Sequence, residues 1–275
     1  MGQDVAISGD MLPVSLVLTQ RSGAHAIVSF CRPPQNALTT DLFRDLEVVL
    51  DELEADPAVR ALILTGKGRF FSSGVDLHVL AAEDLSVLAE LLTVGKKVLR
   101  RIERFPRPVI AAVNGHAFGG GLEIALACHF RILEHGALLG LTESNLGLIP
   151  GLDGVERLVA LVGRGRALDC LIFGKRLTAT TAAAMGLASQ VSQRNRVLDD
   201  AGAFAAELSG RSQTATRLLL DAVHHLQVST PSLDRHTTEA CLEAARSEEA
   251  RRAVRGLLAT SPEIDRDQLR EERAE

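Results

Sequence analysis

Two glutamates stand where acid–base chemistry could be carried out. Glu123 lies in the first turn of a predicted helix, directly after three consecutive glycines, and Glu143 follows at the end of a predicted strand. Two carboxylates that share an apolar site resist being charged together, so one can act as a base while the other acts as an acid. A glutamate in a first helical turn can equally serve only to complement the helix dipole. The residue types alone leave both interpretations open.

Two glycine-containing turns, residues 70–77 and 114–123, each follow a buried strand and could bind an oxygen atom. Glycine lets backbone N–H groups approach a ligand closely and adopt positive φ. The start of a helix also presents free N–H groups with a partial positive charge. Two such groups that converge on one oxygen would form an oxyanion hole. A third tight turn, residues 147–151, leads into another helix.

Alternating strands and helices must hold these turns in place. Short buried or alternating runs predict strands at residues 14–19, 26–30, 61–65 and 109–113, with two more inside 128–141. Apolar spacing and end signals predict helices after Thr39 or Thr40 as far as Asp56-Pro57, from Asp84 to Glu103, from about Leu122, and over 154–162, 164–173 and 178–185. The chain is nearly all helical in character after residue 199. This order predicts an α/β core over residues 1–195, which carries the site, and a helical C-terminal region over 196–275 with a charged tail from about residue 262.

Composition limits the classes of partner. The chain has 275 residues and a formal net charge of −5, which argues against nucleic acid or an anionic membrane as the main partner. No apolar run approaches the length of a transmembrane helix, and the first residues lack the pattern of a secretory signal. The four cysteines have neither disulfide-framework nor zinc-ligand spacing. We therefore expect a cytoplasmic protein with reduced thiols and no metal site.

Several common catalytic motifs are absent. Gly119–Gly121 follows a strand and opens a helix but lacks the spacing of a dinucleotide-binding loop, and Gly174-Lys175 lacks the preceding glycine of a P-loop. Neither H-E-x-x-H nor G-x-S-x-G occurs. The sequence therefore has none of the motifs that usually indicate nucleotide binding, a zinc protease or a serine hydrolase.

Over residues 14–191 the sequence resembles the crotonase superfamily, and within it the enoyl-CoA hydratase/isomerase family. The resemblance is carried by three segments in order: Phe71-Ser72-Ser73-Gly74-Val75-Asp76-Leu77, similar to F-[SC]-A-G-x-D-[LI]; 111–123, similar to A-V-N-G-x-A-x-G-G-G-x-E; and Gly147-Leu148-Ile149-Pro150-Gly151. It implies an α/β fold of the ClpP/crotonase type, built from repeated ββα units with a helical C-terminal part.

The resemblance also implies a role for each site residue. The backbone N–H groups of Ser73 and Gly120 would hold a thioester oxygen and stabilise an enolate. Glu123 would hold and activate water, and Glu143 would give a proton to the α carbon or remove it in reverse. Gly151 would help to hold the water. The implied substrate contacts are Phe71, Gly74, Asp76, Leu77, Gly119 and Gly151. Lys67 and Arg69, beside the first turn, could contact a phosphate or could simply be solvated surface residues.

Two glutamates at these positions favour a hydratase or dehydratase acting on an α,β-unsaturated acyl thioester, as in fatty acid metabolism. The alternatives are a Δ3,Δ2-enoyl-CoA isomerase that uses Glu143 alone and a non-catalytic relative that acts in binding, including RNA binding. Coenzyme A would enter as part of the substrate and not as a cofactor. We expect no nucleic acid or membrane partner, and a homotrimer or a dimer of trimers assembled through the C-terminal helices.

This sequence departs from the family pattern in two places. Leu152 and Asp153 replace small residues that commonly follow the Pro-Gly turn. Asp153 is expected to serve as a dipole partner at a helix start, with a third carboxylate in the site as the alternative. The C-terminal part lacks the aromatic and lysine that often hold the adenosine of coenzyme A, so the acyl group could also arrive on a carrier protein.

Overall fold

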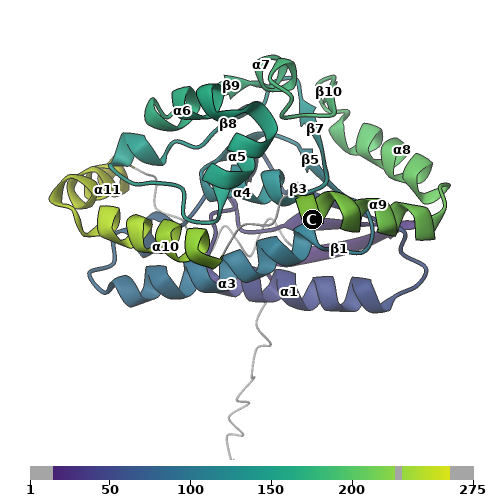
Figure 1. Ribbon diagram of the computed structural model, residues 1–275, viewed down its shortest axis with the longest axis horizontal. Coiled ribbons are helices and arrows are strands. Elements are labelled where there is room, and N and C mark those ends of the chain that lie inside the picture. The colour runs from purple at the N-terminus through teal and green to yellow at the C-terminus, as the bar shows by residue number, and fades with distance from the viewer. Residues whose placement is uncertain (1–14, 227–230, 261–275) are drawn as a thin grey trace, which may run out of the picture.

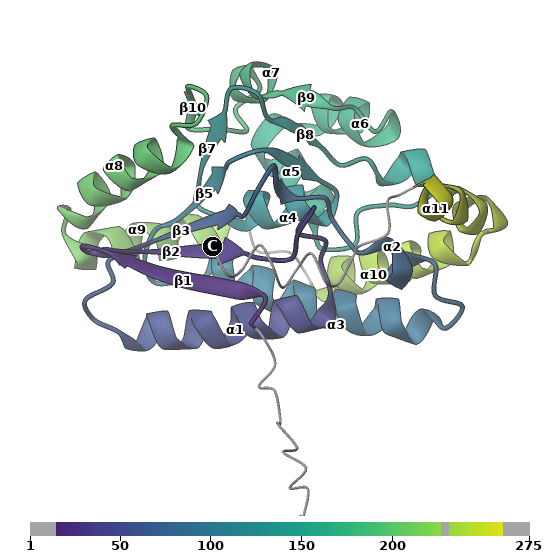
Figure 2. The ribbon, with the colours of Figure 1, turned by 180° about the vertical axis from the view of Figure 1, so that it is seen from behind.

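The strands of the structure form two sheets. In the computed structural model, which describes residues 15–226 and 231–260, the larger sheet has the order β1-β2-β3-β5-β7-β10. Its strands are β1 (Val17–Ser22), β2 (His25–Phe30), β3 (Ala61–Gly66), β5 (Val109–Val113), β7 (Phe130–Glu134) and β10 (Gln190–Ser192). The β1–β2 hairpin is antiparallel, and the other neighbours are parallel. Figure 2 shows the hairpin lying beside β3, with which β2 pairs.

Three of the four short strands in the smaller sheet each follow a strand of the larger one, and the fourth, β9, follows α6. Its order is β4-β6-β8-β9, with β4 (Phe70–Ser72), β6 (His116–Phe118), β8 (Leu138–Gly140) and β9 (Leu177–Thr178). Each of the pairs β3–β4, β5–β6 and β7–β8 is followed by helical structure, which confirms the expected repeated ββα units. The sequence analysis assigned β4 and β6 to turns because three-residue strands carry too few residues to display a period.

Helices surround the two sheets (Figure 1). They are α1 (Thr40–Ala55), α2 (Leu77–Leu80), α3 (Leu85–Glu103), α4 (Gly120–Ala127), the 3₁₀ turn η1 (Glu143–Leu146), α5 (Gly154–Val162), α6 (Arg164–Ile172), α7 (Ala179–Ala184), α8 (Val197–Ser209), α9 (Gln213–Leu226), α10 (Pro231–Arg246) and α11 (Glu248–Thr260). Side-chain caps begin α1 and α3, and the cap predicted at Thr39 is confirmed. Thr39 accepts a hydrogen bond from the Leu42 N–H at the start of α1, and Asp84 accepts one from Ser86 at the start of α3.

The C-terminal helices differ in what they cover. Helix α8 packs on one face of the larger sheet, where Ala201 and Ala205 lie against Ile63 and Ile110. Helices α10 and α11 contribute Cys241, Ala245 and other apolar side chains to the main core. Their position beside α3 and η1 is visible at the left of Figure 1. The C-terminal region therefore packs against the same chain that carries the glutamates. The predicted charged tail from residue 262 lies outside the described residues.

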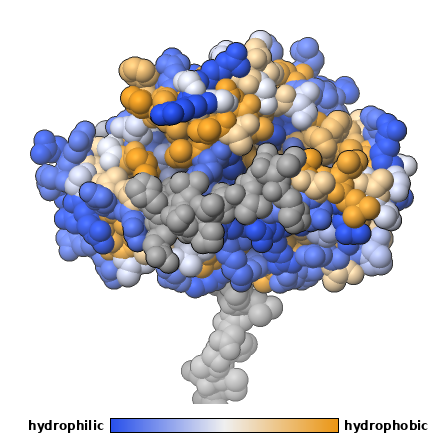
Figure 3. Space-filling model, in the orientation of Figure 1, coloured by the Kyte–Doolittle hydropathy of each residue, from blue (hydrophilic) through white to orange (hydrophobic). Residues whose placement is uncertain are grey.

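Apolar side chains gather on two outer faces of the molecule. Figure 3 shows orange areas over α6 at the upper left and over α8 and α9 at the right. The exposed apolar residues of these helices are Leu168, Ile172, Leu198, Leu218, Leu219 and Val223. Within the described residues, no helix combines the length and apolar character needed to cross a membrane.

Candidate active site

The Glu123 carboxylate is held by two backbone N–H groups from a distant turn. Glu123 lies in the first turn of α4 and is only 1% exposed. Its Oε1 accepts hydrogen bonds from the N–H groups of Leu152 and Gly154, each at 2.8 Å, at the start of α5. The carboxylate is thereby fixed at the positive end of a second helix. Sequence reasoning missed these two donors because they meet Glu123 only through the packing of α5 on α4.

Gly154 must be a glycine for this contact to form. A Cβ atom at residue 154 would lie 2.6 Å from Glu123 Oε1, well inside the van der Waals distance. Substitution Gly154→Ala is therefore expected to displace the carboxylate and lower kcat/KM by ~10²-fold, as a misplacement of about 1 Å can do. Steady-state kinetics on a folded variant checks this. Gly165→Ala is the matched control, because a Cβ there meets no atom within 4 Å, and wild-type activity in Gly154→Ala would contradict the assignment.

Glu143 approaches the second glycine turn from the other side. It begins η1, and its Oε1 would lie 3.1 Å from a Cβ at Gly119, where φ is +49°. The residue as a whole is partly exposed, yet its Oε2 is buried and has no hydrogen-bond partner among the described residues. A buried, unpaired carboxylate oxygen is costly unless a ligand or a proton satisfies it. Glu143 is thus available for a proton or a substrate.

Burial raises the pKa of both carboxylates, and the charge of Glu123 raises that of Glu143 further. Burial raises the pKa of Glu123 to about 7, although the Leu152 N–H, Arg157 and the Gly154 N–H act to lower it. Burial and the charge of Glu123 raise the pKa of Glu143 to about 8. One carboxylate can therefore be ionised and the other protonated near neutral pH, which is the condition for paired base and acid chemistry.

The two glycine turns meet beside these carboxylates. Gly74 has φ of +97°, and a Cβ there would lie 3.2 Å from the Gly120 backbone nitrogen and 2.8 Å from the Phe118 carbonyl oxygen. This approach leaves no room for a side chain at residue 74. Gly120 is the first residue of α4, so its N–H group is free of the helix ladder. The turns predicted from sequence are thus brought together.

The predicted donor Ser73 is not directed at this position. Its N–H group donates to the Gln35 carbonyl at 2.9 Å, so the structure corrects the prediction that this amide holds a ligand oxygen. The next residues pair with Leu38: the Leu38 N–H donates to the Gly74 carbonyl, and the Asp76 N–H donates to the Leu38 carbonyl. This alternation turns the Val75 N–H away from Leu38. Within the part of the chain that is described, the Val75 amide has no acceptor.

The remaining predicted residues near the first turn have structural contacts. Phe71 is fully buried and packs edge-on against Phe30. Asp76 caps α2 by accepting from the His78 N–H at 2.8 Å, and it forms an ion pair with Arg32 at 2.5 Å. Leu77 is the first residue of α2. These contacts position the turn, and direct substrate contact by these residues stays a prediction.

Two predicted cations lie on the surface between β3 and β4. Lys67 and Arg69 are both exposed, and the charge of Arg69 contributes, after burial, to a lowered pKa of His116. His116 accepts from the Leu138 N–H through Nδ1 and lies between Phe70 and Phe118, as a packing residue would. A phosphate contact by Lys67 or Arg69 therefore stays a prediction.

Gly151 lies under the C-terminal helix α10 and not in open space. A Cβ at residue 151 would lie 2.6 Å from Leu92 Cδ2 and 2.9 Å from Cys241 Sγ. Burial and the charges of Glu123 and Glu143 raise the pKa of the Cys241 thiol to about 12. Cys241 therefore lies beside both carboxylates. Sequence reasoning did not predict that the C-terminal region completes the surroundings of the site, because nothing local in the sequence indicates where α10 docks.

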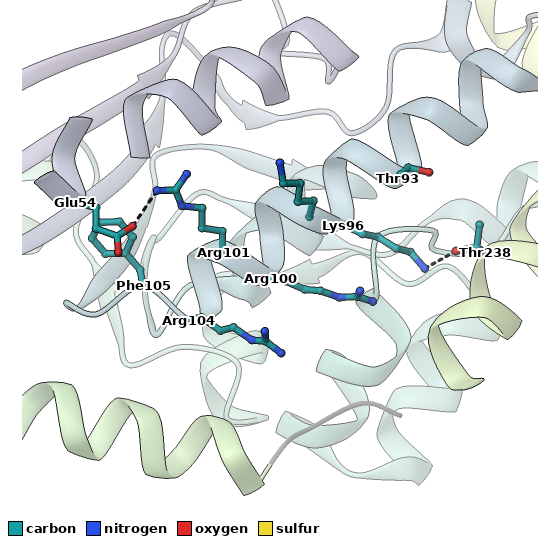
Figure 4. Close-up of a pocket in the computed structure, with 9 residues that line it drawn as sticks. Glu54, Thr93, Lys96, Arg100, Arg101, Arg104, Phe105 and Thr238 are labelled. Atoms are coloured by element: carbon teal, nitrogen blue, oxygen red, sulfur yellow. Dashed lines mark hydrogen bonds and ion pairs between the residues drawn. The ribbon is translucent and has the colours of Figure 1, made fainter. Parts of the chain in front are cut away.

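A separate surface pocket of about 620 Å³ lies along α3 (Figure 4). Its lining includes Lys96, Arg100 and Thr238, and Figure 4 shows Lys96 extending from α3 to Thr238 of α10. Neither glutamate lines this pocket. The chemistry is therefore assigned to the two carboxylates and not to this cavity.

Comparison with known proteins agrees with this geometry. The sequence model of the family described as "Enoyl-CoA hydratase/isomerase" matches residues 20–259. The chain is 38% identical over 239 residues to a "Probable enoyl-CoA hydratase" of Bacillus subtilis, covering 85% of this chain and 92% of that protein. It is 35% identical over 210 residues to a "Short-chain-enoyl-CoA hydratase" of Clostridium acetobutylicum, covering 76% of this chain and 80% of that protein.

The fold agrees as well. The structure of an enoyl-CoA hydratase from Mycobacterium avium subsp. paratuberculosis has a TM-score of 0.80 and 25% identity to this chain, and the match covers 89% of this chain and all of the other. The family match spans both glycine turns, both glutamates and α10. By sequence, fold and site, this chain belongs to the enoyl-CoA hydratase/isomerase family of crotonase-fold enzymes.

Proposed function

We propose that this protein is an enoyl-CoA hydratase, which adds water across the α,β double bond of an acyl thioester or removes it in reverse. The observation that carries the proposal is the pair of buried carboxylates with raised pKa values, Glu123 and Glu143, beside two converging glycine turns. Water addition needs one group to accept a proton and another to donate one. An isomerase would need only one such group, and no feature of the site favours it.

The proposed chemistry assigns one step to each group. Ionised Glu123 accepts a proton as water adds through its oxygen to the β carbon. The electrons of the double bond move to the thioester oxygen, where the N–H groups of Gly120 and Val75 stabilise the enolate. Each such donor contributes ~2.7–4 kcal/mol to transition-state stabilisation. Protonated Glu143 then gives its proton to the α carbon, and a proton returns from Glu123 through solvent to reset the pair. No resident cofactor enters this scheme.

We further propose a short acyl group carried by coenzyme A. Leu152 is buried close to Gly120, and Leu92 and Cys241 are buried close to Gly151, so the surroundings of the site are closely packed, which favours a short acyl group. The name of the Clostridium acetobutylicum relative, a short-chain enzyme, supports the same choice. An acyl-carrier protein is the alternative carrier. Lys67 and Arg69 are the proposed contacts for the phosphates of coenzyme A.

Hydration of trans-2-enoyl-CoA substrates of increasing chain length tests the proposal. The conjugated enoyl thioester loses its absorbance as the 3-hydroxyacyl product forms. We expect the highest kcat/KM for the four-carbon substrate and a decline for longer chains. A folded protein that consumes none of these substrates would contradict the proposal, and conversion of 3-enoyl to 2-enoyl thioesters instead would support the isomerase.

The pH dependence of hydration is expected to be bell-shaped and narrow. Below the Glu123 pKa of about 7 both carboxylates become protonated and the base is lost, whereas above the Glu143 pKa of about 8 both become ionised and the acid is lost. The pKa values read from the acidic and alkaline sides of the profile belong to the coupled pair of carboxylates and not to either residue alone. A kcat/KM profile between pH 5 and 10 checks this, and activity that stays constant across that range would contradict the assigned roles.

We propose a cytoplasmic homotrimer or dimer of trimers. The free cysteines support a reducing compartment. Helix α9 presents Leu218, Leu219 and Val223 to solvent, with Leu219 67% exposed, and an apolar helix face of this kind is typical of a subunit contact. Sedimentation equilibrium should give a mass three or six times 29.4 kDa, and a monomer at micromolar concentration would contradict the assembly.

A further inference from the structure

Asp153 has an unusual conformation at the start of α5. It occupies the N-cap position with φ of +63° and ψ of +26°, in the left-handed region, yet its side chain forms no capping hydrogen bond. A non-glycine residue in this region is uncommon and needs support from its surroundings. Asp153 therefore lies at the start of a helix, as expected, but its carboxylate does not bind the free N–H groups of that helix.

The carboxylate of Asp153 is paired with cations from two helices. Oδ1 lies 3.0 Å from Lys96 Nζ, and Oδ2 lies 3.1 Å from an Arg100 nitrogen, both on α3. Arg157, on the next turn of α5, is 3.9 Å away. Lys96 and Asp153 are 4% and 6% exposed, so solvent screens this pair little. Lys96 also donates to Thr238 Oγ1 of α10 at 2.8 Å, as the dashed line in Figure 4 shows.

This cluster lies directly behind the donors that hold Glu123. Asp153 stands between Leu152 and Gly154, whose N–H groups bind the Glu123 carboxylate. Arg157 also donates to the Leu152 carbonyl and forms a two-point ion pair with Glu103 at 2.7 and 3.1 Å. A displacement of Asp153 would therefore move both N–H groups at once.

We propose that Asp153 is a positioning residue for the hydration reaction: anchored by Lys96 and Arg100, it fixes the 152–154 backbone against Glu123, and its charge offsets the cations next to that carboxylate. This inference rests on the proposed function. Without the negative charge of Asp153, Arg157 would favour the ionised form of Glu123 more strongly, and a carboxylate stabilised in this way accepts a proton from water less readily.

The charged groups around Glu123 fix the sign of the expected effect. Arg157 lowers the pKa of Glu123 and Asp153 raises it, both after the larger effect of burial. Glu143 and Cys241 face the same carboxylate from η1 and α10. Removing the charge at residue 153 should therefore lower the pKa of Glu123. Loss of the two N–H donors would instead raise it, because these hydrogen bonds favour the ionised form.

Two variants remove the charge of Asp153 without straining the backbone. Asparagine tolerates the left-handed region and keeps the size of the side chain, and glycine adopts that region without strain. In both Asp153→Asn and Asp153→Gly, we expect kcat to fall by ~10²-fold with little change in KM, and the acidic limb of the pH profile to move to lower pH. Asp51→Asn, at an exposed residue paired with Arg101, is the control and should match wild type.

Infrared titration of the carboxyl band provides a readout without substrate. The protonated-carboxyl band that disappears in Glu123→Gln should titrate at lower pH in Asp153→Asn than in wild type. Wild-type kcat with an unchanged acidic limb of the pH profile in Asp153→Gly, or a carboxyl band in Asp153→Asn that titrates at the wild-type pH, would overturn the proposal. If the protein fails to hydrate any enoyl thioester, the proposed function fails, while the infrared shift still tests the charge effect of Asp153.

One further variant guards against misfolding. Asp153→Asn removes the carboxylate that faces the buried Lys96 and could unfold the chain. The double variant Lys96→Met/Asp153→Asn removes this cation together with the carboxylate. We expect it to fold, by circular dichroism and thermal melting, and to keep the low kcat. A folded double variant with wild-type kcat would overturn the positioning role.

Discussion

Replacement of either Glu123 or Glu143 by glutamine is expected to lower kcat/KM for enoyl-thioester hydration by ~10³–10⁴-fold. Glutamine keeps the shape of each side chain and removes the ability to exchange a proton. Glu123→Gln removes the base for water, and Glu143→Gln removes the acid for the α carbon. Steady-state kinetics with a four-carbon enoyl-CoA measures both effects. Because the two groups act in one reaction, the double variant should be little worse than either single variant.

The control for this comparison is Glu90→Gln. Glu90 lies on α3, where it is exposed and paired with Arg44, far in sequence from both glycine turns. Its replacement should leave kcat/KM near the wild-type value. Glu123→Gln with full hydration activity would contradict the assignment of Glu123 as the base.

Glu143→Gln is also expected to stabilise the folded protein at alkaline pH. The folded-state pKa of Glu143 is raised from 4.5 to about 8 by burial and by Glu123, whereas the unfolded chain has the ordinary value. Between these two pH values the unfolded chain is ionised more readily, so Glu143 costs stability that grows as pH rises to about 8 and is absent below about 4.5. Glutamine removes this cost, which is on the order of 2–4 kcal/mol.

Urea unfolding at two pH values measures the difference. The free energy of unfolding of Glu143→Gln should exceed that of wild type at pH 8.5 and approach it at pH 5. Glu90→Gln, which breaks only an exposed ion pair, should differ from wild type by ~0–1 kcal/mol at both values. A Glu143→Gln variant that is less stable than wild type at pH 8.5 would contradict the burial of an unpaired carboxylate. At catalytic sites, a substitution that removes activity commonly raises the free energy of unfolding, as expected here.

Local signals in the sequence predicted much of the fold. The strand at 109–113 and the helix at 154–162 have the predicted bounds, the predicted cap Thr39 begins α1, and α3 starts where a helix from Asp84 was expected. These elements are long or end in residues with a clear physical role, so each is determined by its own segment. The short strands β4 and β6 were missed because their pairing is set by residues far away in sequence.

The site was predicted in outline and corrected in detail. Motif spacing indicated Glu123, Glu143 and Gly120. The assignment of Ser73 as a donor was wrong because its N–H orientation depends on pairing with the 35–38 segment, and only the folded chain reveals that the Val75 amide is the one turned away from Leu38.

Contacts between elements that are distant in the sequence could not be predicted from the sequence. The N–H groups that hold Glu123 come from α5, the cations that hold Asp153 come from α3, and the thiol beside both glutamates comes from α10. A departure from the family pattern, Asp153, was the one local signal of this arrangement. Its significance depends on Lys96, which lies far from it in sequence and 3.0 Å from it in space.

The central claim is that Glu123 and Glu143 together add water to an enoyl thioester, and mass spectrometry in H₂¹⁸O tests it most directly. Wild-type protein would be incubated with trans-2-butenoyl-CoA in H₂¹⁸O beside Glu123→Gln and Glu143→Gln, and the acyl-CoA masses followed over time. We predict a wild-type product heavier by one ¹⁸O-labelled water, with only traces of it in either variant. An unchanged substrate mass with wild-type protein, or full labelling by either variant, would contradict the claim.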